Sequence, residues 1–329
     1  MTSVATAANP RRGPMWLLPV VWVVLTVALI LAVRALPWQR ALEQVRHVAP
    51  VWVITAIIAY LLPIPLWALE WRLLAPRTVR VAYSKMFEVV AVMAAVLNSI
   101  PFFAGETAGV GMLIGRAGLS RGAALSVLAL DQLLSGVVKL VVLGTAALLV
   151  PLPVWLRSGI LALVIGVAVL LAVLVPLAHR GPTIRTRLLV RPSPLHRLAA
   201  LFASLGEHLD ALRETHRVGK VVLLGLAKKA AELLAILAIQ RAFGLEPSLA
   251  AATLVLAALA IATLMPVAPA NIGVYEAVVF AAYRYMGVPA ETALGLAVVQ
   301  HICFLIPTLG TGYVTMTLRQ LLPRSSRAA

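Results

Sequence analysis

Long apolar stretches separated by short basic loops are the feature that most constrains how this chain can fold. Several of them approach the ~20 apolar residues that a helix needs to cross a bilayer. Of the 329 residues, 62% are hydrophobic and only 12% are charged, which is more apolar surface than a soluble core can use. We therefore expect one all-α, polytopic integral membrane domain over residues 1–329.

The apolar stretches predict about six full spans and two helical hairpins that are broken in the middle. The spans are expected over residues 14–33, 50–69, 122–150, 155–176, 218–239 and 292–318, and the broken hairpins over 86–118 and 249–287. This divides the domain into a first half, 14–178, and a second half, 218–320, joined by a basic cytoplasmic linker over 179–217. Within the linker, leucine and phenylalanine recur every three or four residues from Leu195 to Leu212, as in an amphipathic helix. Such a helix lies on the membrane surface or contacts a partner protein.

The two hairpin breaks resemble each other. In residues 100–125 and 265–294 an apolar helix ends at proline, and a short glycine-containing break, one glutamate and a second apolar stretch follow. The two glutamates are Glu106 and Glu276. Helices broken at corresponding places in two halves are typical of a transport site at the interface between repeats. The sequence therefore predicts that the breaks line a common cavity.

The distribution of charge predicts the topology. The chain has 28 Lys and Arg against 12 Asp and Glu, a net charge of +16. Because the arginines lie in loops between spans, orientation and anionic lipid headgroups explain the excess better than nucleic acid does. With both termini in the cytoplasm, most basic loops fall inside, and the two hairpins enter from opposite faces of the membrane. Related elements of opposite orientation form an inverted repeat.

Ionisable side chains inside spans are costly and are candidates for a substrate pathway. Glu106 and Glu276 rank first, although each could instead cap the helix that follows its break. Asn98, Asn271 and Arg284 complete the polar set near the breaks.

Further candidates lie on the long spans. Asp131 begins a polar stripe with Ser135 and Lys139, and an internal Asp–Lys pair is as plausible there as a ligand path. Lys228 and Glu232 lie one helical turn apart, so they form either a self-neutralising pair or a site for a lipid phosphate. Gln300 lies 169 residues after Asp131 and is expected to face the same cavity from the other half.

Sequence motifs for catalysis, metals and cofactors are missing. The chain has no H-E-x-x-H, G-x-S-x-G or P-loop pattern and no Cys/His spacing typical of a metal site. Its single cysteine, Cys303, excludes an internal disulfide. We therefore expect no catalytic residues, no metal and no cofactor, although a bare carboxylate pair could still serve a membrane enzyme.

The breaks also carry a family resemblance. GETAGVGML from Gly105, GLSRGAALSVLALDQLL from Gly118 and NIGVYEAVVF from Asn271 resemble the lysylphosphatidylglycerol synthase transmembrane (flippase-like) family, over about residues 67–312. The resemblance implies a lipid-translocating module, which in this family is fused to an aminoacyl-lipid synthase or stands alone, with some members linked to glycolipid and hopanoid export. We expect a stand-alone member without the synthase domain, so aminoacyl transfer is not carried over to this chain.

Four positions depart from the family pattern. The arginine that usually follows the first Gly-Glu is replaced by Gly109, the usual Glu-Arg pair by Asp131–Gln132, and a later acid by Ser135. Losing two arginines favours a smaller or neutral headgroup, such as that of a hopanoid.

The expected function is lipid translocation across the bacterial inner membrane. The expected partners are membrane lipids and, in addition, proteins of lipid biosynthesis, and no binding of nucleic acid is expected. The alternatives are an intramembrane lipid-modifying enzyme and a non-transporting scaffold of a lipid-biosynthesis complex.

Overall fold

The protein is all-helical, as the apolar periodicity predicts. The computed structural model describes residues 37–100, 104–189, 206, 208–264 and 268–321. The helices of the first part are α2 (Trp38–Arg46), α3 (Pro50–Leu61), α4 (Pro63–Leu74), α5 (Tyr83–Ser99), α6 (Ala104–Gly115), α7 (Arg121–Leu149) and α8 (Val154–Leu189). Those of the second part are α10 (Asp210–Arg213), α11 (Thr215–Ala242), α12 (Leu249–Ala262), the 3₁₀ turn η1 (Pro269–Asn271), α13 (Val274–Tyr285) and α14 (Ala290–Leu321).

Four helical segments of the described chain are long and apolar enough to cross a membrane, which makes this a multi-pass membrane protein. They are Pro50–Leu74, Arg121–Leu149, Val154–Ala178 and Ala290–Leu321. The expected span over 14–33 lies outside the described residues. Helix α11 is also long enough, but Lys228, Lys229 and Glu232 interrupt its apolar middle. Of the five expected spans that fall on described residues, four are therefore confirmed by length and composition, and the fifth, 218–239, lies on α11, a helix of mixed character.

Proline and residues with positive φ mark the interruptions between helices. Pro63 separates α3 from α4 within the second expected span. In the second break the backbone of Ala270 and Asn271 is left-handed, with φ of 53° and 54°. L-residues rarely adopt this conformation, so the surrounding contacts must hold the break in place.

Each predicted hairpin consists of two helices that pack on one another across their break, α5 with α6 and α12 with α13. Glycine allows the first pair to approach closely. A Cβ atom on Gly105 would lie 2.5 Å from the Cβ atom of Leu97, and one on Gly109 would lie 2.5 Å from the sulfur of Met93. The two helices are therefore antiparallel, and the backbone of α6 at these glycines lies directly against side chains of α5.

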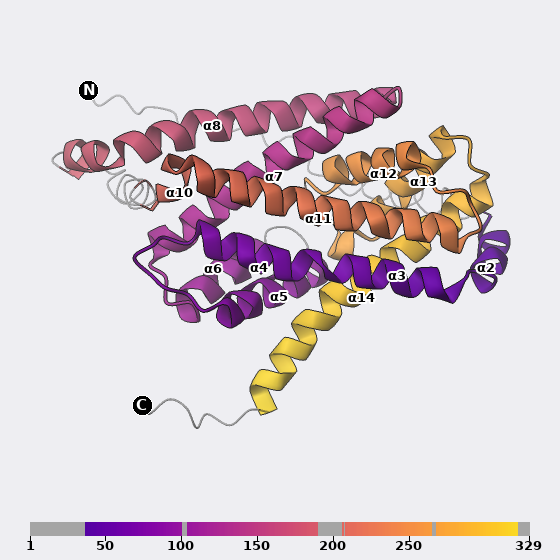
Figure 1. Ribbon diagram of the computed structural model, residues 1–329, viewed down its shortest axis with the longest axis horizontal. Helices are drawn as coiled ribbons and strands as arrows, with labels where there is room; N and C mark the ends of the chain where they lie inside the picture. Colours follow the sequence, from indigo (N-terminus) through magenta and orange to yellow (C-terminus); the bar gives the residue numbers. More distant parts are fainter. Residues whose placement is uncertain (1–36, 101–103, 190–205, 207, 265–267, 322–329) are drawn as a thin grey trace, which may run out of the picture.

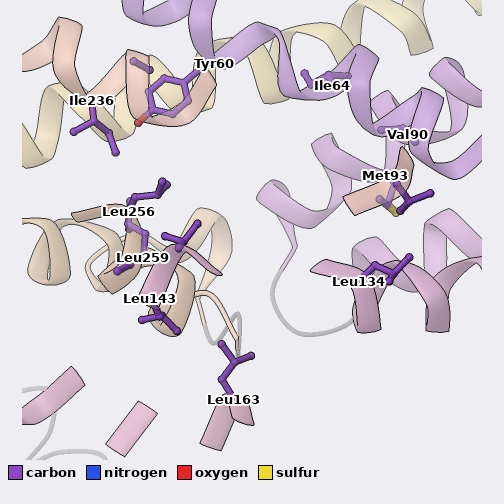
Figure 2. Packing of buried hydrophobic residues seen from close by; sticks show 14 of the residues in the cluster. Tyr60, Ile64, Val90, Met93, Leu134, Leu143, Leu163, Ile236, Leu256 and Leu259 are labelled. Atoms are coloured by element: carbon purple, nitrogen blue, oxygen red, sulfur yellow. The ribbon is translucent and has the colours of Figure 1, made fainter. Parts of the chain in front are cut away.

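The longer helices pack on the two hairpins. Helix α14 packs on α5, α7 packs on α12, and α11 packs on both α3 and α4. Their apolar side chains form one cluster, part of which appears in Figure 2, with Leu143 from α7, Leu163 from α8 and Leu256 from α12. Helix α8 runs along one edge of the bundle in Figure 1 and leaves many of its large apolar side chains exposed.

The segment expected to be a linker differs from the prediction at its start. Helix α8 does not end near Pro176 but continues to Leu189, into the expected linker. Most of the predicted amphipathic helix lies outside the described residues. In its described end, Leu209 is fully buried in the protein core, and Arg213 donates hydrogen bonds to the carbonyl of Ala178. This end of the segment is therefore anchored on the protein.

Candidate functional site

A cavity of about 940 Å³ lies among the helices, and both breaks contribute to its wall. Leu97, Glu106 and Thr107 line it from the first break, and Thr263, Leu264 and Asn271 line it from the second. The remaining wall comes from α3, α4, α7, α8, α11, α12, α13 and α14. A single space thus adjoins the two segments that resemble each other in sequence.

Six of the nine predicted site residues line this cavity. They are Asn98, Glu106, Asp131, Lys228, Glu232 and Asn271. The other three, Glu276, Gln300 and Arg284, do not contribute to its wall.

The first break places three polar side chains at the cavity, those of Asn98, Glu106 and Thr107. Glu106 is the third residue of α6, where a carboxylate can interact with the free N–H groups of the first turn. Its Oε2 atom is buried and has no hydrogen-bond partner in the described part of the chain. Asn98 donates from Nδ2 to the carbonyl of Ala94 at 2.8 Å, within its own helix. Glu106 therefore keeps an acceptor free for a ligand.

Asp131 is held by two indoles. Its Oδ1 atom accepts hydrogen bonds from Nε1 of Trp67 and Nε1 of Trp71, both at 2.8 Å. Hydrogen bonds to a charged group contribute ~1.5–3 kcal/mol each. Asp131 and Lys139 do not form the internal ion pair that the stripe suggested; the partners of Asp131 are the tryptophans of α4. These donors could not be recognised from the spacing of polar residues on α7.

The lysines of α11 form pairs other than the expected one. Lys228 forms an ion pair with Glu70 of α4, and its ammonium lies 5.4 Å from the ring centroid of Trp67. Glu232 pairs instead with Lys229, whose Nζ atom lies 2.7 and 2.8 Å from its two oxygens. Glu70 is only 1% exposed and was missed, although a single acid inside the apolar stretch 50–74 was a sufficient signal.

Glu276 stabilises the second break from behind the cavity wall. One of its oxygens accepts the N–H of Gly273 at 2.7 Å, and the other lies 2.7 Å from Nδ1 of His301. The Nε2 atom of His301 lies 2.9 Å from the carbonyl of Ala270. Both ring nitrogens thus face oxygen atoms, so a proton must lie between His301 and Glu276, and the pair is neutral overall. The role of Glu276 as a helix cap, one of its two expected roles, is the one visible in the contacts.

Gln300 and Arg284 also lie away from the space they were expected to face. Gln300 is fully buried and donates from Nε2 to the hydroxyl of Tyr275 at 3.0 Å. Tyr275 lines the cavity and stacks on His301, with ring centroids 4.2 Å apart. Arg284 is exposed and donates to the carbonyl of Val288 at 2.7 Å, which closes the turn after α13. Tyr275 thus separates Gln300 from the cavity.

The charges of the wall are balanced in number. Three acids, Glu106, Asp131 and Glu232, and three lysines, Lys139, Lys228 and Lys229, line the cavity. Charged groups at membrane depth are stable only where they are paired or hydrated. The cavity can therefore receive a polar group that apolar lipid chains would exclude.

The comparison with protein families agrees with this picture. Residues 16–312 match the family model described as the lysylphosphatidylglycerol synthase TM region. Neither the search of curated proteins nor the search of solved structures found a significant match. The match covers most of the chain, and the family suggests a role related to membrane lipids. The chain belongs to the lysylphosphatidylglycerol synthase TM region family.

Proposed function

We propose that the protein translocates a lipid between the leaflets of the bacterial inner membrane. The observation that carries the proposal is the cavity of about 940 Å³ with six charged side chains in its wall, set among membrane-spanning helices. Moving a polar headgroup through hydrocarbon is costly because no partner there satisfies its charges and hydrogen bonds. A polar cavity lowers this cost, while the acyl chains can remain in lipid.

We further propose that the two hairpins, each with the long helix that follows it, form an inverted repeat. The packing of the helices supports this. If α5, α6 and α7 correspond to α12, α13 and α14 in that order, the contact of α5 with α14 corresponds to the contact of α12 with α7, and both contacts are present. The pairs α5–α6 and α6–α7 likewise correspond to α12–α13 and α13–α14. In this arrangement the termini are cytoplasmic, and rocking of one repeat against the other exposes the cavity to each leaflet in turn.

The substrate is a polar lipid, and a hopanoid or another isoprenoid lipid is the more specific possibility raised by the missing arginines. No chemical change of the lipid is needed, so the protein acts as a transporter and not as an enzyme. The test uses purified protein in vesicles of phosphatidylethanolamine and phosphatidylglycerol that contain a trace of acyl-labelled fluorescent phosphatidylglycerol. A membrane-impermeant quencher then reports the fraction of label that reaches the outer leaflet, and a labelled hopanoid replaces the phospholipid in a parallel series.

We expect label to exchange faster than in protein-free vesicles. Glu106→Gln removes a charge from the cavity and is expected to slow exchange at least tenfold. Glu276→Gln keeps an oxygen that can accept the N–H of Gly273, and is expected to slow exchange less. Exchange no faster than in protein-free vesicles, for every lipid tested, refutes the function. Equal rates for wild type and both variants remove the glutamates from the mechanism.

The same vesicles separate the alternatives. A lipid-modifying enzyme would change the mass of the lipid recovered from them, whereas a transporter changes only its leaflet. A scaffold would leave both unchanged, and its function in cells would be lost on deletion of the segment 195–212.

A further inference from the structure

A second, smaller hollow adjoins the main cavity on the side of α8. Its volume is about 270 Å³, and its walls are the facing surfaces of α7 and α8 together with Leu264. Five residues line both spaces: Gln132, Ser135, Lys139, Leu170 and Leu264. The two spaces therefore adjoin each other along the seam between α7 and α8.

The outer wall of this seam faces lipid. Helix α8 packs on α7 and α12, and only 22% of its most apolar membrane-length window is buried. The helices touch closely at Gly136, where a Cβ atom would lie 2.6 Å from a methyl group of Val167. At Gly166, by contrast, no atom lies within 4 Å of the position of a Cβ atom. The seam thus combines one narrow contact with open space one residue away on α8.

The junction between the two spaces carries hydrogen-bond donors without partners. Gln132, Ser135 and Lys139 lie three, four and seven residues apart on α7, so they share one face of the helix. In the described part of the chain none of the three side chains has a hydrogen bond or an ion pair. The other two lysines of the cavity wall are paired, Lys228 with Glu70 and Lys229 with Glu232. Lys139 is therefore the cation of the wall that is available to a ligand.

We propose that the seam between α7 and α8 is the lateral portal of the transporter, through which the acyl chains of the lipid extend into the bilayer while its headgroup occupies the cavity. The donors at the junction, with Lys139 foremost, bind an anionic group at the base of the headgroup, such as a phosphodiester. An ammonium near a phosphate inside a cavity forms a charge-assisted hydrogen bond that is stronger than one between neutral groups. This inference rests on the proposed function. Because Lys139 supplies the wall with an unpaired cation although the two arginines of the family pattern are missing, it favours a lipid with an anionic group over the neutral hopanoid considered above.

A reversible lock tests the portal. A Cβ atom on residue 136 would lie 3.9 Å from the Cβ atom of Val167, within the range for a disulfide, so Gly136→Cys with Val167→Cys can join α7 to α8. The variant is made with Cys303→Ala, which removes the single native cysteine. We expect oxidation to slow exchange of labelled phosphatidylglycerol at least tenfold and reduction to restore it, and the recovery shows that the protein remained folded.

The two single variants, Gly136→Cys and Val167→Cys, each with Cys303→Ala, serve as the matched comparison, because they carry the same new side chains but cannot form the bridge. Oxidation is expected to leave the exchange rate of each single variant unchanged. An equal loss on oxidation of the single variants would assign the effect to the oxidant and overturn the portal, and so would full activity of the oxidised double variant.

A plug tests the open part of the seam without a disulfide. Gly166→Trp is expected to fill the smaller hollow and slow exchange at least fivefold. Gly144→Trp is its control, because Gly144 is exposed on α7, lies outside both hollows and has open space beside it. Equal exchange rates in the two variants would contradict the portal.

Binding tests the anionic subsite independently of transport. Purified protein is equilibrated with phosphatidylglycerol in detergent, and the lipid it retains is counted by native mass spectrometry. We expect Lys139→Met to reduce retention at least fivefold and Lys139→Arg to preserve it. Unchanged retention in Lys139→Met overturns the subsite. If the wild type moves no lipid, the proposed function fails. If the wild type moves lipid and neither the lock nor the plug changes the exchange rate, only the portal is refuted.

Discussion

The ion pair between Lys228 and Glu70 is the contact of the site whose loss should cost most stability. Glu70 is 1% exposed, and in the described residues its only ion-pair partner is the ammonium of Lys228. Lys228→Met leaves the carboxylate buried without a counter-charge. Breaking a buried pair in this way costs ~3–5 kcal/mol, which is on the order of a hundredfold to several thousandfold in the equilibrium constant of unfolding.

The double variant makes this prediction specific. Replacing both partners by methionine removes the unpaired charge, and such replacements are neutral or stabilising in other buried pairs. We therefore expect Glu70→Met with Lys228→Met to recover the free energy of unfolding to within ~1 kcal/mol of the wild type. Lys220→Met, at an exposed position on the same helix, is the control and should change it by no more than ~0.5 kcal/mol.

The assay is an unfolding titration with SDS in mixed micelles, followed by tryptophan fluorescence. Trp67 lies beside the ammonium of Lys228 and should report the loss of this region. Two results would refute the reasoning: a single variant Lys228→Met as stable as the control, or a double variant no more stable than Lys228→Met. Either would mean that Glu70 and Lys228 do not depend on each other for their burial.

Two further predictions concern helix packing and capping, and both are measured with the same titration. Gly312→Ala places a methyl group against the carbonyl of Ala91, so α5 and α14 must separate, and we expect the free energy of unfolding to fall by ~1–3 kcal/mol. Gly310→Ala is the control, because its methyl group meets open space, and it should be neutral or slightly stabilising. Glu276→Ala removes the acceptor of the Gly273 N–H and should cost ~0.5–2 kcal/mol, whereas Glu276→Gln should cost less; equal losses would argue against the cap.

The sequence was sufficient to place the cavity but not to assign the partners within it. Hydrophobic length and proline located the hairpins, because a helix in lipid must satisfy its own backbone and breaks only where protein or a polar space replaces lipid. The residues that flank the breaks, Glu106 and Asn271, consequently line the cavity. Both follow from local chemistry alone.

Contacts between distant helices could not be predicted in the same way. Spacing on one helix suggested Lys228 with Glu232, yet Lys228 pairs with Glu70, 158 residues earlier in the chain. Asp131 likewise binds two indoles of α4, whose tryptophans look like ordinary apolar residues in the sequence. Which faces of two helices meet depends on the packing of the whole bundle, and a periodic pattern on one helix carries no information about it.

The close contact between α5 and α6 determines how the site can move. Because Gly105 and Gly109 leave no room beside Leu97 and Met93, the two helices cannot slide or rotate against each other without a steric clash. They must travel as one rigid body, and Glu106 keeps a fixed position relative to α5 throughout. Any alternation of access therefore requires a hinge at the ends of the pair, and Gly118, with φ of 73° in the turn before α7, is placed to provide it.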